Sequence, residues 1–465
     1  MPDLSDPDIL ACLPPGASLL FRLTLLAFQL ISKLAIFARP EKPVKSPGLN
    51  GGSWYSLVKM KNNFGNIRIA DYTYDLPLER IAKYPLPERD RSKLLVWNGS
   101  NISDNIFSEL PALVDSTCLM VFNNTRVIRA RLIFRKESGA VIEVFCLEPH
   151  SPAEFSLNLA SGGAVEWKCL VGNLKRWKHG ILESPFIHDG RECILTAERT
   201  GTAGDAFTVR FNWNESTLSF AEVLECLGHM PIPPYLDRDD EESDISAYQT
   251  TYARINGSVA APTAGLHFTP SVLAGLDAAG IERAEVTLHV SAGTFRPVKS
   301  ELICDHLMHS EHFLVSKQTL ERLRGRKTTA VGTTTVRTLE SLYWLGMSLF
   351  EGRWPDDGIP TVSQWEPYEK EGEIDPAVAI DCLLAELERS GRDTLEARTD
   401  IIIVPGYRFR MVSSMVTNFH QPHSTLLLLV AAFAGESWRK IYDHALVSDY
   451  RFLSYGDSML ITLRS

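Results

Sequence analysis

The spacing of apolar residues changes along the chain and divides it into regions. Between residues 130 and about 210, short apolar runs recur between polar and glycine-rich turns and show no helical period. These runs are residues 131–134, 141–147, 155–159, 167–171, 194–197 and 207–211. Short strands at this spacing predict a small antiparallel barrel or sandwich.

After residue 219, helical patterns alternate with strand patterns. We predict helices over residues 220–227, 270–279, 316–326, from about 335, and over 380–388, 424–433 and 438–447. We predict strands over residues 283–290, 328–331 and 400–404, preceded by strands at 94–97 and 119–122 and a helix start at 75–82. Alternation of this kind indicates an α/β fold with a largely parallel sheet or barrel, interrupted by the all-β region.

Residues 19–37 are the most apolar run in the chain, but Arg22 and Lys33 interrupt it. A charge near the centre of a spanning helix costs about 2.5–3.5 kcal/mol, which disfavours a membrane span. Three interpretations remain: an interfacial helix, a docked helix, or a non-native extension followed by a linker at 40–52. We favour the third, with Met60 as the native start, so residues 1–66 form an N-terminal extension, disordered or non-native, with an apolar helix near 18–38. Peptides from residues 1–50 in the native protein would contradict this hypothesis.

Charge and cysteine content limit the classes of function. The 47 basic and 57 acidic residues give a net charge of −10, so any RNA binding requires a local basic patch. Such patches are offered by Arg126, Arg129 and Arg131, and by Lys175 and Lys178 with an aromatic residue between them, although an ordinary solvated strand face has the same pattern. The eight cysteines form no C-x-x-C pair and no zinc-like spacing, which indicates reduced thiols in a cytosolic protein.

Several short polar blocks stand beside apolar runs. His267 lies among small residues, His289 ends a predicted strand, and His309 lies two residues from Glu311, whose carboxylate could set the pKa of a histidine. Residues 330–341 resemble a phosphate-binding turn that opens a helix, but no Walker A loop or G-x-G-x-x-G is present. Each block alone is equally compatible with a structural role.

The blocks occur in a distinctive order. They read YDLP, IAKYPLPERDRSKLL, VFNNTRVIRARL, GHMPIPPY, YQTTYA, SVAAPTAGLHF, VTLHVSAGTFRPV, DHLMHSE, AVGTTTVRTLES, PGYRF, TNFHQPHSTLLLLVAAFAG and YRFLSYGDSML. In this order they resemble the S-adenosylmethionine:tRNA ribosyltransferase-isomerase family of queuosine synthesis, from about residue 72 to residue 465. The chain departs from the family at Arg129, where proline is usual, at Gln421, where leucine is usual, and at Ser413 and Ser414, one of which replaces an acidic residue. These departures leave every candidate reacting group in place.

The resemblance implies a fold and a reaction. The fold would be a distorted α/β barrel-like main domain, residues 67–130 and 220–465, with an inserted β-barrel domain at 131–219. The enzyme would transfer and isomerise the ribosyl group of S-adenosylmethionine onto 7-aminomethyl-7-deazaguanine at the tRNA wobble position. Epoxyqueuosine-tRNA, adenine and methionine would be the products. We expect a cytoplasmic monomer without metal, resident cofactor, membrane contact or stable protein partner.

This chemistry requires a base for the proton next to the sulfonium, an acid for the leaving adenine, and polar groups for both substrates. The catalytic candidates are His267, His289, His309, Glu311, His420 and Asp457, and our first choice for the base is a histidine. The substrate-binding candidates are Asn123, Asn124, Thr125, Arg126, Phe268, Thr294, Arg296, Thr333, Thr334, Thr335, Arg337, Thr417, Asn418, Arg451 and Tyr455. Arg129, Arg131, Lys175 and Lys178 are the candidates for tRNA phosphates.

Two other classes of function compete with this interpretation. One is an RNA-binding protein that has lost catalysis, although all the histidine-bearing blocks are present. The other is a methyltransferase, which the missing glycine-rich donor loop disfavours. The apolar N-terminus leaves open a tether to a membrane.

Overall fold

The computed structural model describes residues 64, 66–204, 206–291, 293, 298–355, 358–370 and 372–463. Thr294, Arg296 and nearly all of the predicted N-terminal extension lie outside these residues.

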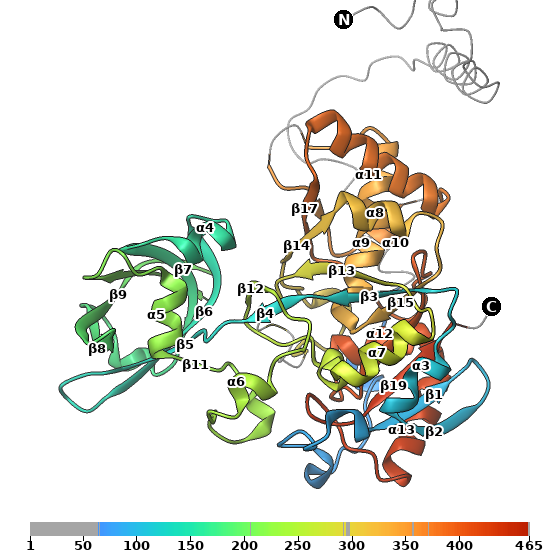
Figure 1. The fold of residues 1–465 in the computed structure, drawn as a ribbon, viewed down its shortest axis with the longest axis horizontal. Coiled ribbons are helices and arrows are strands. Elements are labelled where there is room, and N and C mark those ends of the chain that lie inside the picture. The colour runs from blue at the N-terminus through green and yellow to red at the C-terminus, as the bar shows by residue number, and fades with distance from the viewer. Residues whose placement is uncertain are drawn as a thin grey trace, which may run out of the picture. The chain divides into compact units, whose positions relative to one another are not determined.

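A ten-stranded mixed sheet lies at the centre of the larger part of the described chain (Figure 1). Its order is β16-β17-β14-β13-β3-β15-β18-β19-β1-β2. The strands are β1 (Lys93–Trp97), β2 (Ile102–Ile106), β3 (Leu119–Asn123), β13 (Arg283–Leu288), β14 (Glu311–Ser316), β15 (Thr328–Val331), β16 (Thr361–Val362), β17 (Thr394–Thr399), β18 (Val412–Asn418) and β19 (Ser458–Thr462). The central strands β13, β3, β15 and β18 are mutually parallel. All residues of β3 and β15 are buried, as expected for parallel strands covered on both faces.

Helices cover this sheet, and the most buried of them is α9 (Thr333–Phe350). Every residue from Thr333 to Ser348 is buried. Helix α11 (Pro376–Ser390) packs against it, and α8 (Lys317–Leu323) packs against α11 (Figure 1). Further α-helices are α3 (Leu110–Leu113), α6 (Asp244–Ala247), α7 (Pro270–Ala278), α10 (Glu366–Glu369), α12 (Thr425–Ala434) and α13 (Ser437–Val447).

A seven-stranded antiparallel sheet, in the order β11-β5-β6-β7-β10-β9-β8, surrounds a separate apolar core. Its strands are β5 (Arg131–Arg135), β6 (Val141–Ser151), β7 (Ala164–Val171), β8 (Leu182–His188), β9 (Arg191–Ala203), β10 (Ala206–Trp213) and β11 (Gly228–His229). Helices α4 (Phe155–Ala160) and α5 (Phe220–Leu227) contribute Phe155 and Phe220 to this core. Strands β4 (Thr125–Val127) and β12 (Ile255–Ser258) form a separate parallel pair.

The mixed α/β class is confirmed, while closure of either sheet into a barrel stays a prediction. Two predicted strands are wrong. Residues 155–159 form α4, because the buried Phe155, Asn158 and Leu159 recur at helical spacing rather than in alternation. Residues 400–404 belong to no strand; β17 is the strand just before them, and side chains of Arg337 and Tyr368 donate to their carbonyls. The predicted helix start at 75–82 contains one 3₁₀ turn, Leu78–Arg80.

Glu340 on α9 holds the segment that leads into β18. Its buried carboxylate accepts hydrogen bonds from the backbone N–H groups of Arg410, Met411 and Val412 and from the Tyr407 hydroxyl. Burial raises the pKa of this carboxyl, and these hydrogen bonds oppose that rise. One side chain thereby satisfies three backbone donors, those of Met411 and Val412 buried and that of Arg410 partly buried.

We expect Glu340→Ala to destabilise the protein by about 3 kcal/mol or more, because each buried N–H left without an acceptor costs roughly 1–3 kcal/mol. Urea unfolding followed by circular dichroism measures the change. Glu351→Ala is the control, since Glu351 is exposed and pairs with Arg353 at the surface. Equal unfolding midpoints for the two variants would contradict the assigned role of Glu340.

Candidate active site

Four parallel strands end at one edge of the large sheet, where their following residues gather. β3 ends at Asn123, β13 is followed by His289, β15 by Gly332 and β18 ends at Asn418. Ligands of α/β sheets bind outside the carboxyl ends of such strands. Three pockets lie at this edge, and the three consecutive residues after β13 each line a different one. His289 lines the first pocket, Val290 the second and Ser291 the third, and the three pockets are described in turn below.

The pocket at Val290, here called the threonine pocket, is lined by five of the sequence candidates. Its void is about 70 Å³, which suits one end of a ligand rather than a whole drug-sized molecule. No Asp, Glu, Lys or Arg is among the described residues that line it. The sequence candidates on its wall are Thr333, Thr334, Thr417, Asn418 and His420.

His420 is the titratable histidine of the threonine pocket. Its Nε2 lies 2.9 Å from the Thr417 hydroxyl oxygen, and its carbonyl accepts from the Tyr74 hydroxyl at 2.5 Å. Burial lowers its pKa to about 3, so the ring is neutral at neutral pH. A neutral imidazole on a pocket wall can accept a proton.

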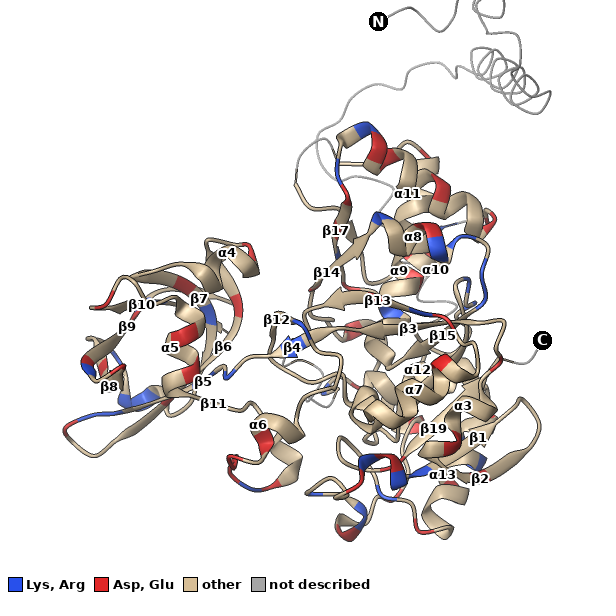
Figure 2. Ribbon diagram, in the orientation of Figure 1, with Lys and Arg blue, Asp and Glu red and all other residues tan. Residues whose placement is uncertain are grey.

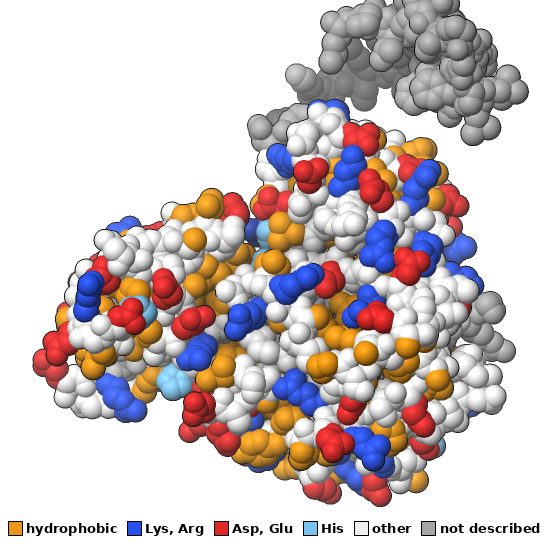
Figure 3. All heavy atoms as spheres, in the orientation of Figure 1, with side chains coloured by type: hydrophobic (Ala, Val, Ile, Leu, Met, Phe, Trp, Pro, Cys, Tyr) orange, Lys and Arg blue, Asp and Glu red, His pale blue; other side chains and the backbone are white. Residues whose placement is uncertain are grey.

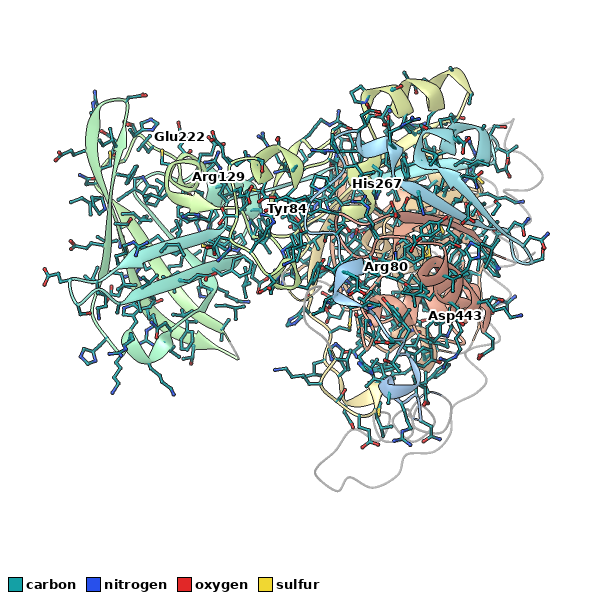
Figure 4. The ribbon with its side chains drawn as sticks, turned by 90° about the horizontal axis from the view of Figure 1, so that it is seen from below. Arg80, Tyr84, Arg129, Glu222, His267 and Asp443 are labelled. Atoms are coloured by element: carbon teal, nitrogen blue, oxygen red, sulfur yellow. The ribbon has the colours of Figure 1, made fainter. Side chains whose placement is uncertain are left out.

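His267 is buried inside the larger part of the protein (Figure 4). It does not line the threonine pocket but lies behind Asn418, which does. Its Nδ1 is 2.9 Å from the Ser92 hydroxyl, and its Nε2 is 3.4 Å from the Asn418 amide nitrogen. Asn418 in turn accepts from the Thr263 hydroxyl at 2.9 Å. Burial lowers the pKa of His267 to about 4. This geometry lets His267 orient Asn418 rather than face a ligand itself.

His289 borders a larger groove of about 590 Å³. Its ring stacks on Phe155 of α4 at 4.1 Å and runs parallel to His312 at 5.8 Å between ring centres. Burial, followed by the neighbouring His312, lowers its pKa to about 3. Asn124 lines the same groove, with its amide bound to Glu285 and Thr287.

Glu311 and Arg337 form a buried ion pair on the wall of the third pocket. The other Glu311 oxygen accepts from the Ser291 N–H, and Arg337 also donates to the Ile401 carbonyl. His309 lines this pocket but is exposed. The partner of the Glu311 carboxylate is therefore Arg337. The sequence had suggested His309, two residues away, as that partner.

The remaining candidates among the described residues lie outside these three pockets. Asn123, Thr125 and Thr335 bond to neighbouring backbone, and Phe268 is fully buried in an apolar cluster. Asp457 accepts from the backbone N–H groups of Lys93 and Arg451, and burial raises its pKa. Arg451 pairs with Asp457, and Tyr455 donates to Asp244.

The basic candidates differ in their freedom to bind phosphate. Arg126, Lys175 and Lys178 are exposed, and Arg129 donates to the Glu225 carbonyl beside α5 (Figure 4). Arg131 is held by Glu143 and Asp240. The aromatic residue between Lys175 and Lys178, Trp177, is fully buried, so its ring is not available to stack on RNA, and its indole N–H donates to the Gly180 carbonyl. Basic residues flank β4 and β5 in Figure 2, and on the face seen in Figure 3 they are interspersed with acidic ones.

Sequence reasoning missed Thr263, Phe155 and His312. His312 has a signal in the sequence, because it stands near His309 and Glu311 and alternates with Glu311 along β14. Phe155 has no such signal, because its ring contacts His289, which is 134 residues away in the sequence.

No group of three or more His, Cys, Asp or Glu in the described part of the chain is arranged to hold a metal ion. None of the helices described is both long and apolar enough to span a bilayer.

The three neutral histidines make stability depend on pH. Their folded pKa values lie below the unfolded value of about 6.5, so the unfolded chain binds more protons as the pH falls. Their stabilising contribution is present above pH 6.5 and is lost progressively as the pH falls from there toward 3. Between pH 7.0 and 5.5 we expect a loss of about 4 kcal/mol from the three together. Urea unfolding at the two pH values measures it, and His289→Asn should reduce the loss by about a third; an unchanged free energy of unfolding would refute the assignment.

Comparison with known proteins extends over most of the chain. Residues 69–461 match a family model described as queuosine biosynthesis protein. Among solved structures, the chain is similar to S-adenosylmethionine tRNA ribosyltransferase from Thermotoga maritima. The two share 29% sequence identity over 84% of this chain and 99% of that one, with a TM-score of 0.40.

Proposed function

The chain belongs to the queuosine biosynthesis protein family, as the sequence predicted, and on that premise we propose that it transfers and isomerises the ribosyl group of S-adenosylmethionine. The acceptor is 7-aminomethyl-7-deazaguanine at the tRNA wobble position. The products are epoxyqueuosine-tRNA, adenine and methionine. The family match over residues 69–461 carries this proposal.

The proposed reaction needs a base that is unprotonated at neutral pH. The proton to be removed is on the ribose carbon next to the sulfonium, whose positive charge makes it acidic. His420 supports this role because it is neutral and borders the threonine pocket. We assign the base to His420 and a positioning role to His267, which reaches the pocket through Asn418. The reaction would run in the cytoplasm, on a monomer, without a resident cofactor.

The decisive assay follows the adenine. The full chain is incubated with S-adenosylmethionine and tRNA that carries the aminomethyl base. Free adenine and methionine are expected. Release of S-adenosylhomocysteine would instead identify a methyltransferase, and tRNA binding without turnover would identify an RNA-binding protein that has lost catalysis.

We expect His420→Gln to lower kcat by roughly 10²–10⁴-fold, the usual contribution of a positioned base, with KM for S-adenosylmethionine within about threefold. The matched control is His423→Asn, three residues away, where asparagine tolerates the positive φ of 56°. His267→Gln should change KM and kcat together, because it misplaces Asn418. Wild-type kcat in His420→Gln would remove His420 from the mechanism.

The exposed basic residues give a separate prediction about tRNA. We expect Lys175→Ala and Lys178→Ala each to raise KM for tRNA severalfold and to reduce the salt dependence of binding by about one unit of slope. The control Lys327→Ala removes an exposed lysine outside the predicted tRNA contacts. Filter binding at several salt concentrations measures the slope, and equal slopes in all three variants would exclude Lys175 and Lys178 from the tRNA contact.

A further inference from the structure

Helix α9 begins at the threonine pocket without a side-chain cap. Its N-cap is Gly332, which has φ of 90° and offers no side-chain acceptor. The Gly332 N–H itself donates to the Val416 carbonyl. Among the described residues, no hydrogen-bond acceptor meets the backbone N–H groups of Thr333, Thr334 and Thr335. Three donors and the positive end of the helix dipole are therefore unsatisfied there.

The Thr334 hydroxyl is a second, independent observation. The residue is 7% exposed, and its Oγ1 has no hydrogen-bond partner among the described residues. Thr334 lines the threonine pocket together with Gly332, and Oγ1 lies 3.6 Å from the position that a Cβ on Gly332 would occupy. Its neighbours differ: the Thr335 and Thr338 hydroxyls donate within the chain, to Val331 and Thr334 carbonyls. A buried hydroxyl without a partner is costly unless a ligand or water completes it.

A second helix start at the pocket, that of α12, has the side-chain cap that α9 lacks. The α12 N-cap, Ser424, accepts from the Leu427 N–H, and its hydroxyl donates to the Gln421 carbonyl. With no charged side chain among the described residues of the wall, the two helix starts are its positive features, and that of α9, uncapped and next to the unpartnered Thr334 hydroxyl, offers a negative group more free donors.

We infer that the first turn of α9, with the Thr334 hydroxyl, binds the α-carboxylate of the methionine half of S-adenosylmethionine, an inference that rests on the proposed function. The backbone N–H groups and the hydroxyl supply the donors for the two carboxylate oxygens. The void of about 70 Å³ has room for this end of the donor, and His420 lies on the same wall.

The charge of the site favours a carboxylate over a phosphate of tRNA. A helix N-terminus carries about half a positive charge, which complements a single negative charge. A phosphate contact in tRNA recognition ordinarily comes from Lys or Arg, and the described lining of this pocket has neither. The exposed basic residues among the sequence candidates, Arg126, Lys175 and Lys178, do not line this pocket.

The test compares two donors on each preparation of the full chain: S-adenosylmethionine and its analogue without the carboxylate. The readout is kcat/KM for adenine release with tRNA that carries the aminomethyl base. The ratio of the two values is independent of the fraction of folded enzyme. We expect wild type to prefer S-adenosylmethionine at least tenfold, and Thr334→Val to lower that preference about tenfold through a higher KM, because a charge-assisted hydrogen bond is lost.

Two variants control for the hydroxyl and for the helix. Thr334→Ser keeps the donor and should retain the preference within about threefold. Thr338→Val removes a buried hydroxyl one turn further along α9, bound inside the helix, and should leave the preference unchanged.

Other outcomes separate the two proposals. An unchanged preference in Thr334→Val, or equal use of both donors by wild type, overturns the carboxylate site while adenine release still supports the proposed function. A raised KM for tRNA with unchanged donor preference overturns it in favour of a phosphate. No adenine from either donor in wild type overturns the proposed function itself, and with it this inference.

Discussion

The parallel alignment of β13, β3, β15 and β18 is the constraint on which the candidate site depends. Parallel strands place their carboxyl ends at one edge, so segments from four distant parts of the sequence meet there. A one-residue slip of β18 against β15 would turn Asn418 away from its present face. The backbone hydrogen bonds of the sheet therefore bring the strand ends of the threonine pocket together, and side-chain contacts such as those of Asn418 with His267 and Thr263 then orient the site residues.

Helix α9 connects this edge to the interior. Its first turn lines the threonine pocket, Arg337 in its second turn pairs with Glu311, and Glu340 holds the segment before β18. A buried ion pair adds little net stability, but breaking it is costly because one charge remains unpaired. These contacts tie β14, β15 and β18 to one helix, so the walls of neighbouring pockets depend on each other.

The sequence predicted much of the fold because local patterns decide it. The helix over residues 220–227 and the strand over 328–331 agree with α5 and β15, where apolar spacing and flanking residues leave little choice. Residues 400–404 show the limit: an apolar run is equally consistent with a strand and with an extended segment whose carbonyls bind Arg337 and Tyr368.

The ordered motifs identified the family and the candidate residues, but they did not show which of these residues line a pocket and which lie behind its wall. Nothing in a linear pattern distinguishes His420, on a pocket wall, from His267, which reaches that wall only through Asn418. That distinction arises from which strand end each follows and how deeply its loop is buried.

The near-complete burial of α9 has a consequence for binding thermodynamics. Its first-turn amides are held by a helix whose residues from Thr333 to Ser348 are all buried, so they have little conformational entropy left to lose. A group that docks there meets donors already in place, as in a preorganised receptor, and its affinity should derive mainly from enthalpy.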